Sequence, residues 1–133
     1  MLNWLESNNR RIINNSQALI LELSKSFQYK ELKKEDIKAP KTVYAADKEQ
    51  LLRMGKNFPF PFLTKHNRAG RGLGIKLFYD YVSFRKYLNS IHLKDSIDGI
   101  TLLKEYIKPK TGTIIRTEFI DSQFFYALQM HVT

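Results

Sequence analysis

The stretch "FLTKHNRAGRGLGIKLF", residues 62–78, decides the expected fold. A hydrophobic run ends at Lys65, a short basic loop carries Gly70, Gly72 and Gly74, and a second hydrophobic run follows directly. Two strands joined by so short a link are expected to pair as an antiparallel hairpin. Alternating glycines let backbone N–H groups approach an anion, because no Cβ atom obstructs them. The loop is therefore either a phosphate-binding hairpin or a merely mobile one, and its composition alone does not choose.

Composition points to one intracellular globular domain. The chain has 133 residues, of which 43% are hydrophobic and 13% aromatic, as in folded proteins. It has no cysteine, which excludes disulfides and thiolate metal sites. No apolar run reaches the roughly 18–20 residues of a membrane span, and the first residues lack a secretory signal pattern, so a cytoplasmic location is expected. The 22 Lys and Arg against 13 Asp and Glu give +9, which favours an anionic partner.

Helices are expected in the first half of the chain. Leu19, Ile20, Leu23 and Phe27 recur at helical spacing behind an expected N-cap at Ser16. The charged segment "YKELKKEDI" either continues this helix or forms a second one. The proline of "KAPKT" then ends the helical region, and "TVYA" reads as a short strand.

A capping box predicts the next helix. Asp47 and Gln50 have the spacing that opens a helix over "KEQLLRMGK", and Gly55 is expected to close it. Phe58, Phe60 and Phe62 then alternate along the approach to the glycine loop and are expected on one face of a strand, packed in the core.

The second half predicts a mainly antiparallel sheet. The segment "DYVSFRKYLNSI" places Tyr81, Phe84, Leu88 and Ile91 on one helical face. Strands are expected in "GITLLKEYI", "TGTIIRTEFI" and "QFFYALQMHV", the last two joined by a tight turn at residues 121–122. The expected fold class is α+β, with flanking helices on a mainly antiparallel sheet.

Two phosphate-binding motifs are excluded for the glycine loop. A Walker A loop needs a Gly-Lys-Ser/Thr ending that runs into a helix, and the dinucleotide fingerprint needs a strand–loop–helix context. Neither is present. In isolation, Lys65 reads more naturally as a solvated lysine at a strand end.

Five elements in order resemble the ATP-grasp family, in its α-L-glutamate-ligase and glutathione-synthetase-like branch. They are "INNSQALILELSK" ending at Lys25, "APKT" at residues 39–42, "FLTKHNRAGRGLGIKLF", "LLKEYI" at residues 102–107 and "GTIIRTEFIDSQFFYAL" at residues 112–128. Enzymes of this family use ATP to phosphorylate a carboxylate, and an amine then displaces the phosphate to form an amide. The resemblance implies an ATP-grasp-like fold and an ATP or ADP partner.

The resemblance also implies roles for individual residues. Lys25 and Lys65 would contact ATP phosphates or the adenine edge from two directions. The "EYI" segment would be the hinge that recognises adenine, and Arg116 would face the triphosphate or the acyl phosphate as the catalytic residue. The remaining implied nucleotide contacts are His66, Asn67, Arg68, Gly70, Gly72 and Gly74 in the loop, and Glu105, Tyr106 and Ile107 in the hinge.

Each role has a structural alternative. Glu105 could be a solvent-facing strand carboxylate, and Tyr106 a core residue. Arg116 and Glu118 share one strand face and could simply pair with each other. The three histidines are far apart in sequence, so no histidine metal site is expected. Family magnesium ligands lie on later strands, so Mg²⁺ is expected to be bound outside this chain.

The resemblance predicts a partial ATP-grasp domain. Its expected divisions are residues 1–38 as an N-terminal helical segment, 39–98 as a glycine-loop subdomain and 99–133 as the start of a second subdomain. The chain is expected not to be catalytic alone and to associate as a homodimer or with a missing C-terminal portion. Competing functions are a basic module for single-stranded nucleic acid and a ligand-free interaction scaffold.

Overall fold

A four-stranded antiparallel sheet organises the computed structural model, which describes residues 1–70, 72, 74–90 and 96–132. The strands are β1 (Thr42–Ala45), β2 (Phe62–His66), β3 (Lys76–Phe78) and β4 (Thr101–Glu105), in the order β1-β4-β2-β3. All three strand pairs are antiparallel, and β2 and β3 form the expected hairpin around the glycine loop. The predicted α+β class with a mainly antiparallel sheet is confirmed.

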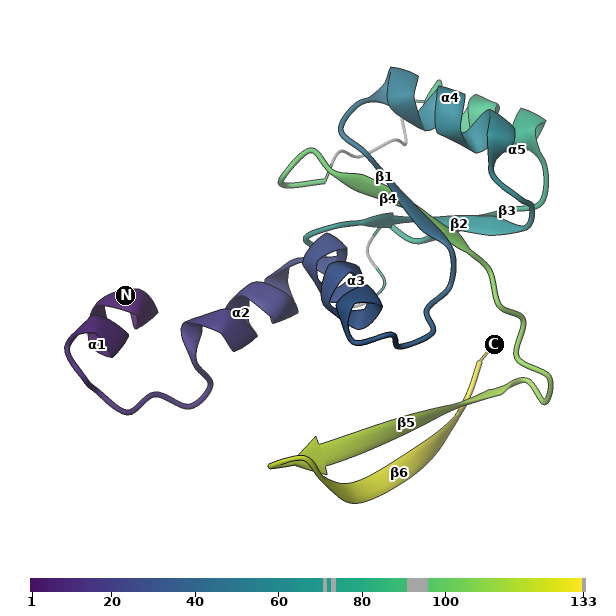
Figure 1. Ribbon diagram of the computed structural model, residues 1–133. Coiled ribbons are helices and arrows are strands. Elements are labelled where there is room, and N and C mark those ends of the chain that lie inside the picture. Colours follow the sequence, from purple (N-terminus) through teal and green to yellow (C-terminus); the bar gives the residue numbers. More distant parts are fainter. Residues whose placement is uncertain (71, 73, 91–95, 133) are drawn as a thin grey trace.

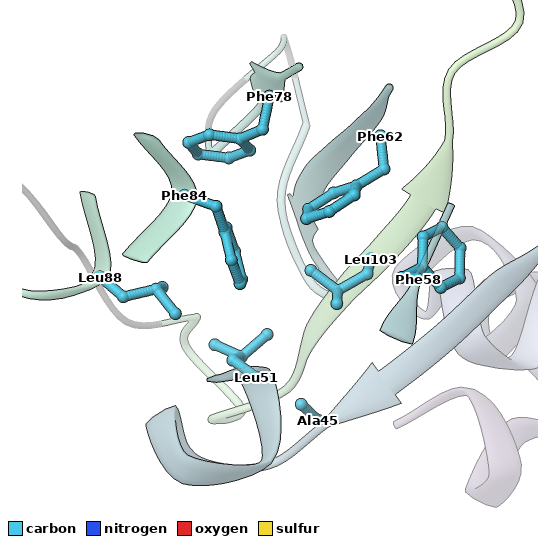
Figure 2. Close-up of a cluster of buried hydrophobic side chains, with 8 residues drawn as sticks. All are labelled: Ala45, Leu51, Phe58, Phe62, Phe78, Phe84, Leu88 and Leu103. Atoms are coloured by element: carbon cyan, nitrogen blue, oxygen red, sulfur yellow. The ribbon is translucent and has the colours of Figure 1, made fainter. Parts of the chain in front are cut away.

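One face of this sheet carries the core. Helices α4 (Lys48–Asn57) and α5 (Tyr81–Leu88) lie on that side, and α3 (Lys25–Lys34) lies on the other (Figure 1). Phe62 of β2 and Phe84 of α5 are fully buried, and their rings meet edge to face with centroids 5.0 Å apart. Figure 2 shows the whole cluster, which comprises Ala45, Leu51, Phe58, Phe62, Phe78, Phe84, Leu88 and Leu103.

The start of α4 follows the predicted capping box, but its end does not follow the prediction. Asp47 Oδ1 accepts a 2.7 Å hydrogen bond from Gln50 N, as predicted. The return bond is shifted by one residue, since Gln50 Oε1 accepts from Ala46 N at 3.1 Å and not from the N-cap N–H. Gly55, expected to close the helix, lies inside it and is buried. A Cβ atom at Gly55 would lie 2.2 Å from Phe84 Cε1, so glycine permits close approach of α5.

The predicted helix from Ser16 is two helices. Helix α2 (Ser16–Leu23) is capped by Asn15, whose side chain accepts from Ala18 N, so the expected cap at Ser16 is wrong by one residue. Ser24 adopts an extended backbone and caps α3 by accepting from Phe27 N. Phe27 therefore belongs to a different helix from Leu23. A short helix α1 (Leu2–Ser7) precedes both.

The three phenylalanines before the loop do not share a strand. Phe58 is the C-cap of α4, Phe60 lies in the connection and only Phe62 is in β2. Phe58 and Phe62 are nevertheless buried in the core, as expected. Burial prevents both rings from stacking on nucleic-acid bases. Of the face predicted for α5, Tyr81, Phe84 and Leu88 pack as expected, and Ile91 lies outside the described residues.

The last two strands form a separate sheet. Strands β5 (Thr113–Ile120) and β6 (Gln123–His131) pair as the expected antiparallel hairpin, which stands apart from the four-stranded sheet in Figure 1. Asp121 and Ser122 both have positive φ, at 48° and 64°, as the tight turn requires. Ten large apolar side chains from Ile114 to Val132 are exposed on this hairpin. In the described part of the chain, no helix is both long and apolar enough to span a membrane.

Candidate functional site

Lys25 lies against the start of the glycine loop. It is the first residue of α3, and its Nζ donates to Asn67 O at 3.1 Å and also to Ala69 O. Its backbone N–H points to the same Asn67 carbonyl at 3.4 Å. Burial lowers the pKa of Lys25, and the carboxylate of Asp98 opposes that shift. The structure thus brings together two elements that the sequence analysis assigned to one site.

Asn67 connects the segments of this arrangement through hydrogen bonds. It is 2% exposed, its Oδ1 accepts from Ser26 N at 2.8 Å, and its Nδ2 donates to Asp98 Oδ2 at 2.6 Å. Its backbone N–H donates to Ile100 O at 3.0 Å. The side chain therefore joins α3 to the segment before β4. Sequence reasoning placed Asn67 among the phosphate contacts and missed Asp98, which holds it.

The glycines differ in what the backbone requires of them. Gly72 and Gly74 have φ of +79° and +72°, a conformation that other residues adopt at a cost. A Cβ atom at Gly74 would also lie 2.5 Å from His66 Cδ2, whereas one at Gly70 would meet nothing within 4 Å. His66 therefore packs against the end of the loop. Arg68 lies in the turn after β2 and is exposed, as is Gly70.

Lys65 projects from the face of β2 that is opposite the core. Its neighbours Thr64 and His66 share the face of Phe62, because side chains alternate along a strand. Burial lowers the pKa of Lys65, and the nearby ammonium groups of Lys104 and Lys25 lower it further. Lys25 and Lys104 therefore both lie near Lys65. Among the described residues, no carboxylate forms an ion pair with any of them.

Lys104 is a neighbour of Lys65 that sequence reasoning did not include among the candidate contacts. It lies on β4 opposite Leu63, while Lys65 lies opposite Leu102, so the two lysines are diagonal neighbours on one face. Its Nζ lies 5.4 Å from the centroid of the Tyr29 ring. The alternation of "LLKEYI" indicates a face for Lys104, but only the register of β4 against β2 shows that Lys65 shares it.

The predicted hinge residues lie together at the end of β4. Glu105 Oε2 accepts from Lys41 N at 3.0 Å, and Glu105 N donates to Lys41 O at 2.9 Å, so this residue ties β4 to the start of β1. Tyr106 N donates to Pro61 O at 3.1 Å and is half-buried. Ile107 is exposed. Adenine recognition by this segment stays a prediction.

Arg116 lies on β5, away from the lysines. Its Nε forms a 2.9 Å ion pair with Glu118 Oε1, and its side chain is 65% exposed. This pairing is the structural alternative that the two-residue spacing suggested. Its role toward a triphosphate stays a prediction, since the hairpin that carries it stands apart from the four-stranded sheet (Figure 1).

The described residues do not fit a magnesium site. In residues 1–70, 72, 74–90 and 96–132, no group of three or more His, Cys, Asp or Glu side chains is placed to hold a metal ion. Half-buried lysines, in contrast, fit an anion, because a phosphate would relieve the repulsion among their ammonium groups.

Comparison with protein families decides the identity of the domain. A family model described as the RimK-like ATP-grasp domain matches residues 23–132. The chain belongs to the RimK-like ATP-grasp family. The match begins just before Lys25 and spans the glycine loop, the hinge segment and the final hairpin of this ATP-grasp domain. Comparison with curated proteins gave no match.

Comparison with solved structures found two ligases that resemble this chain to different degrees. D-alanine–D-alanine ligase from Helicobacter pylori superposes with a TM-score of 0.62 at 22% identity, covering 84% of this chain and 34% of that one. The D-alanine–D-alanine ligase from Bacillus anthracis gives a TM-score of 0.48 at 21% identity, covering 84% of this chain and 42% of that one. The ATP-grasp chain thus spans less than half the length of either ligase. The first superposition shows a shared fold.

Proposed function

We propose that this ATP-grasp chain is the nucleotide-binding portion of an ATP-dependent carboxylate–amine ligase. The observation that carries the proposal is the gathering of Lys25 and Lys65 at the base of the glycine loop, with no described carboxylate ion-paired to either. Membership of the ATP-grasp family supports ATP as the anion. An acceptor of the α-L-glutamate-ligase kind, a cytoplasmic location, and association as a homodimer or with a further C-terminal portion belong to the same proposal.

The chain's own residues would bind and shield the nucleotide. ATP would supply the phosphoryl group that activates a carboxylate for attack by an amine. Lys65 would offset phosphate charge from the sheet, and Lys25 would do so from the start of α3. The loop would close over the phosphates and exclude water, with Gly72 and Gly74 allowing its turns. The described residues do not fit a magnesium site, so the ligands of a magnesium ion would lie outside them.

Nucleotide binding by the purified chain tests this function. Isothermal titration with ATP is expected to give saturable binding that Lys65→Ala abolishes. A matched control is Lys56→Ala, which removes an exposed lysine at the end of α4, on the opposite side of the sheet. Absence of binding at millimolar ATP and ADP would refute the proposal for this chain. Binding of single-stranded oligonucleotides that falls steeply with salt, without a response to ATP, would favour the nucleic-acid function instead.

A further inference from the structure

Lys104 lies between the glycine loop and the hinge segment. Strand β2 leads from Phe62 to the loop, and antiparallel β4 leads from Thr101 to the hinge. Lys104 is therefore displaced from the level of Lys65 by two residues toward the hinge, which is about 6.6 Å along a strand. Lys25, bound to the loop carbonyls, lies at the other end of this row. Three ammonium groups thus follow one another along one side of the sheet.

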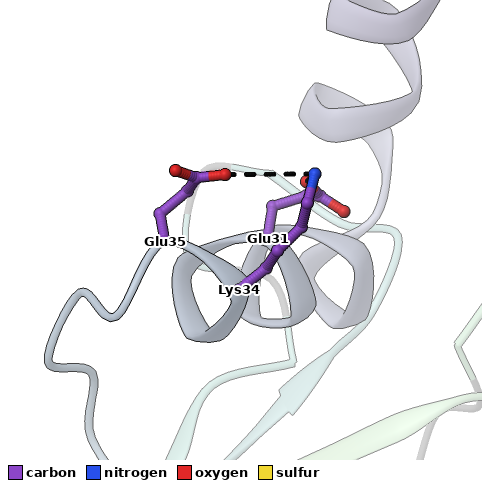
Figure 3. Close-up of polar contacts among 3 residues, drawn as sticks. All are labelled: Glu31, Lys34 and Glu35. Carbon is purple, nitrogen blue, oxygen red and sulfur yellow. Dashed lines mark hydrogen bonds and ion pairs between the residues drawn. The ribbon is translucent and has the colours of Figure 1, made fainter.

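The environment of Lys104 keeps its charge available to an anion. Its side chain is half-buried, and Tyr29 of α3 supports the ammonium group through a cation–π contact. Lys34 on the same helix differs, because it lies 3.3 Å from Glu31 Oε2 and 3.9 Å from Glu35 Oε1 (Figure 3). Among the described residues, Lys104 has no such carboxylate partner. Lys65 and Lys104 in this row repel each other, and an anion between them would relieve that repulsion.

We propose that Lys104 is a third cationic contact to the bound nucleotide, placed at the phosphate that is attached to the ribose. This inference rests on the proposed function, which puts the terminal phosphates at the glycine loop and the base at the hinge. The phosphate nearest the ribose must then lie between them, at the level of Lys104. Because AMP, ADP and ATP all carry that phosphate, Lys104 would contribute to the binding of each.

The position of Lys104 in the row predicts that its variants lose nucleotide affinity in a different pattern from those of Lys25. Lys104→Met is expected to lower the affinities for AMP, ADP and ATP by a similar factor, about tenfold for the loss of one charge-assisted contact. Lys25→Met is expected to lower the affinity for ATP more than the affinity for AMP, because Lys25 lies at the end of the row that is next to the glycine loop. Lys104→Arg, which keeps the charge, is expected to restore most of the affinity. Tyr29→Leu is expected to lower all three affinities to a smaller extent, since it removes only the cation–π contact with Lys104.

Lys76→Met is the matched control. Lys76 is also a strand lysine whose Nζ contacts a tyrosine ring, at 4.7 Å from the centroid of Tyr87. It pairs with Thr64 and so belongs to the opposite face of the sheet. Its removal is expected to leave all three affinities unchanged. Melting temperatures of the variants without nucleotide show whether each one is folded.

Titration calorimetry of the 133-residue chain with AMP, ADP and ATP decides the inference. The inference is supported if Lys104→Met loses affinity for the three nucleotides equally and Lys104→Arg recovers most of that affinity. Wild-type affinity for AMP in folded Lys104→Met overturns it while leaving the proposed function intact, as does a loss confined to ATP. If the wild-type chain binds none of the three nucleotides, the proposed function fails and this inference fails with it.

Discussion

Asn67 Nδ2 donates a 2.6 Å hydrogen bond to Asp98 Oδ2, which joins the first residue after β2 to the segment before β4. The same side chain accepts from Ser26 N, and the Asn67 carbonyl accepts from Lys25 Nζ. A buried residue with so many partners positions its neighbours, because each contact restrains a different segment. The orientation of Lys25 therefore depends on a residue 42 positions away in sequence.

Asn67→Ala tests how much the Asn67 side chain contributes to the stability of this network. The substitution leaves Ser26 N without its acceptor and removes one of the hydrogen bonds to the Asp98 carboxylate, so the free energy of unfolding is expected to fall by about 1–3 kcal/mol. Urea denaturation measures that loss. Asn57→Ala is the matched control, since within the part of the chain that the structure describes the Asn57 amide makes only an exposed 3.4 Å contact with Arg53 O. A loss no larger in Asn67→Ala than in Asn57→Ala would show that Asn67 is not a structural hub.

The three loop glycines are expected to respond to alanine in a fixed order. Gly74→Ala should destabilise most, because it combines φ of +72° with a contact 2.5 Å from His66. Gly72→Ala should lower the free energy of unfolding by about 1–2 kcal/mol because of its backbone conformation alone. Gly70→Ala meets nothing within 4 Å and should be neutral or slightly stabilising. Melting temperatures of the three variants give the order, and a Gly70→Ala loss equal to that of Gly74→Ala would contradict this description of the loop.

Gly55→Ala should change two opposing contributions to stability, helix propensity and core packing. Alanine favours a helix interior by about 1 kcal/mol over glycine. Its Cβ atom would lie 2.2 Å from Phe84 Cε1, and overpacking of a core typically costs about 1–3 kcal/mol. We expect net destabilisation, measured by urea denaturation. Phe84→Leu in the Gly55→Ala background should then cost less than Phe84→Leu alone, because the smaller side chain relieves the contact. Additive losses would rule out this contact as the cause.

The lowered pKa of Lys65 predicts a pH-dependent difference in stability. Burial and then the ammonium groups of Lys104 and Lys25 lower it from an ordinary value of 10.5. The charged form is thus disfavoured in the folded chain, and this destabilisation is fully present below the folded pKa. As the pH rises from the folded pKa toward 10.5, the unfolded chain binds more protons than the folded chain, so stability increases.

Lys65→Met isolates this effect. The variant should be more stable than the wild type at pH 7, and the difference should shrink as the pH approaches 10.5. Urea denaturation of both proteins from pH 7 to pH 10 measures it. A difference that stays constant over this range would show that Lys65 is not electrostatically strained in the fold.

Local patterns were enough to predict most of the elements around the site. The glycine loop between two hydrophobic runs predicted the β2–β3 hairpin, and the spacing of Tyr81, Phe84 and Leu88 predicted α5. Asp47 and Gln50 predicted the start of α4. In each case the determining contacts lie within a few residues, so the sequence alone carries the signal.

Features that depend on distant contacts could not be predicted. The break at Ser24 is stabilised by its hydroxyl and by Asn67, which is 43 residues away. Gly55 looked like a helix end because its true partner, Phe84, lies on another helix. Lys104 joined the site only through the register of β4 against β2. Each required knowledge of which segments become neighbours in space.

Lysine reactivity measured with and without ATP tests the central claim most directly. Brief acylation followed by mass spectrometry reports how accessible each ammonium group is. If Lys25 and Lys65 face one nucleotide, ATP should protect both, while Lys56 on α4 should react equally in either condition. Bound ATP that leaves Lys25 and Lys65 as reactive as before, and protects other lysines, would contradict the account.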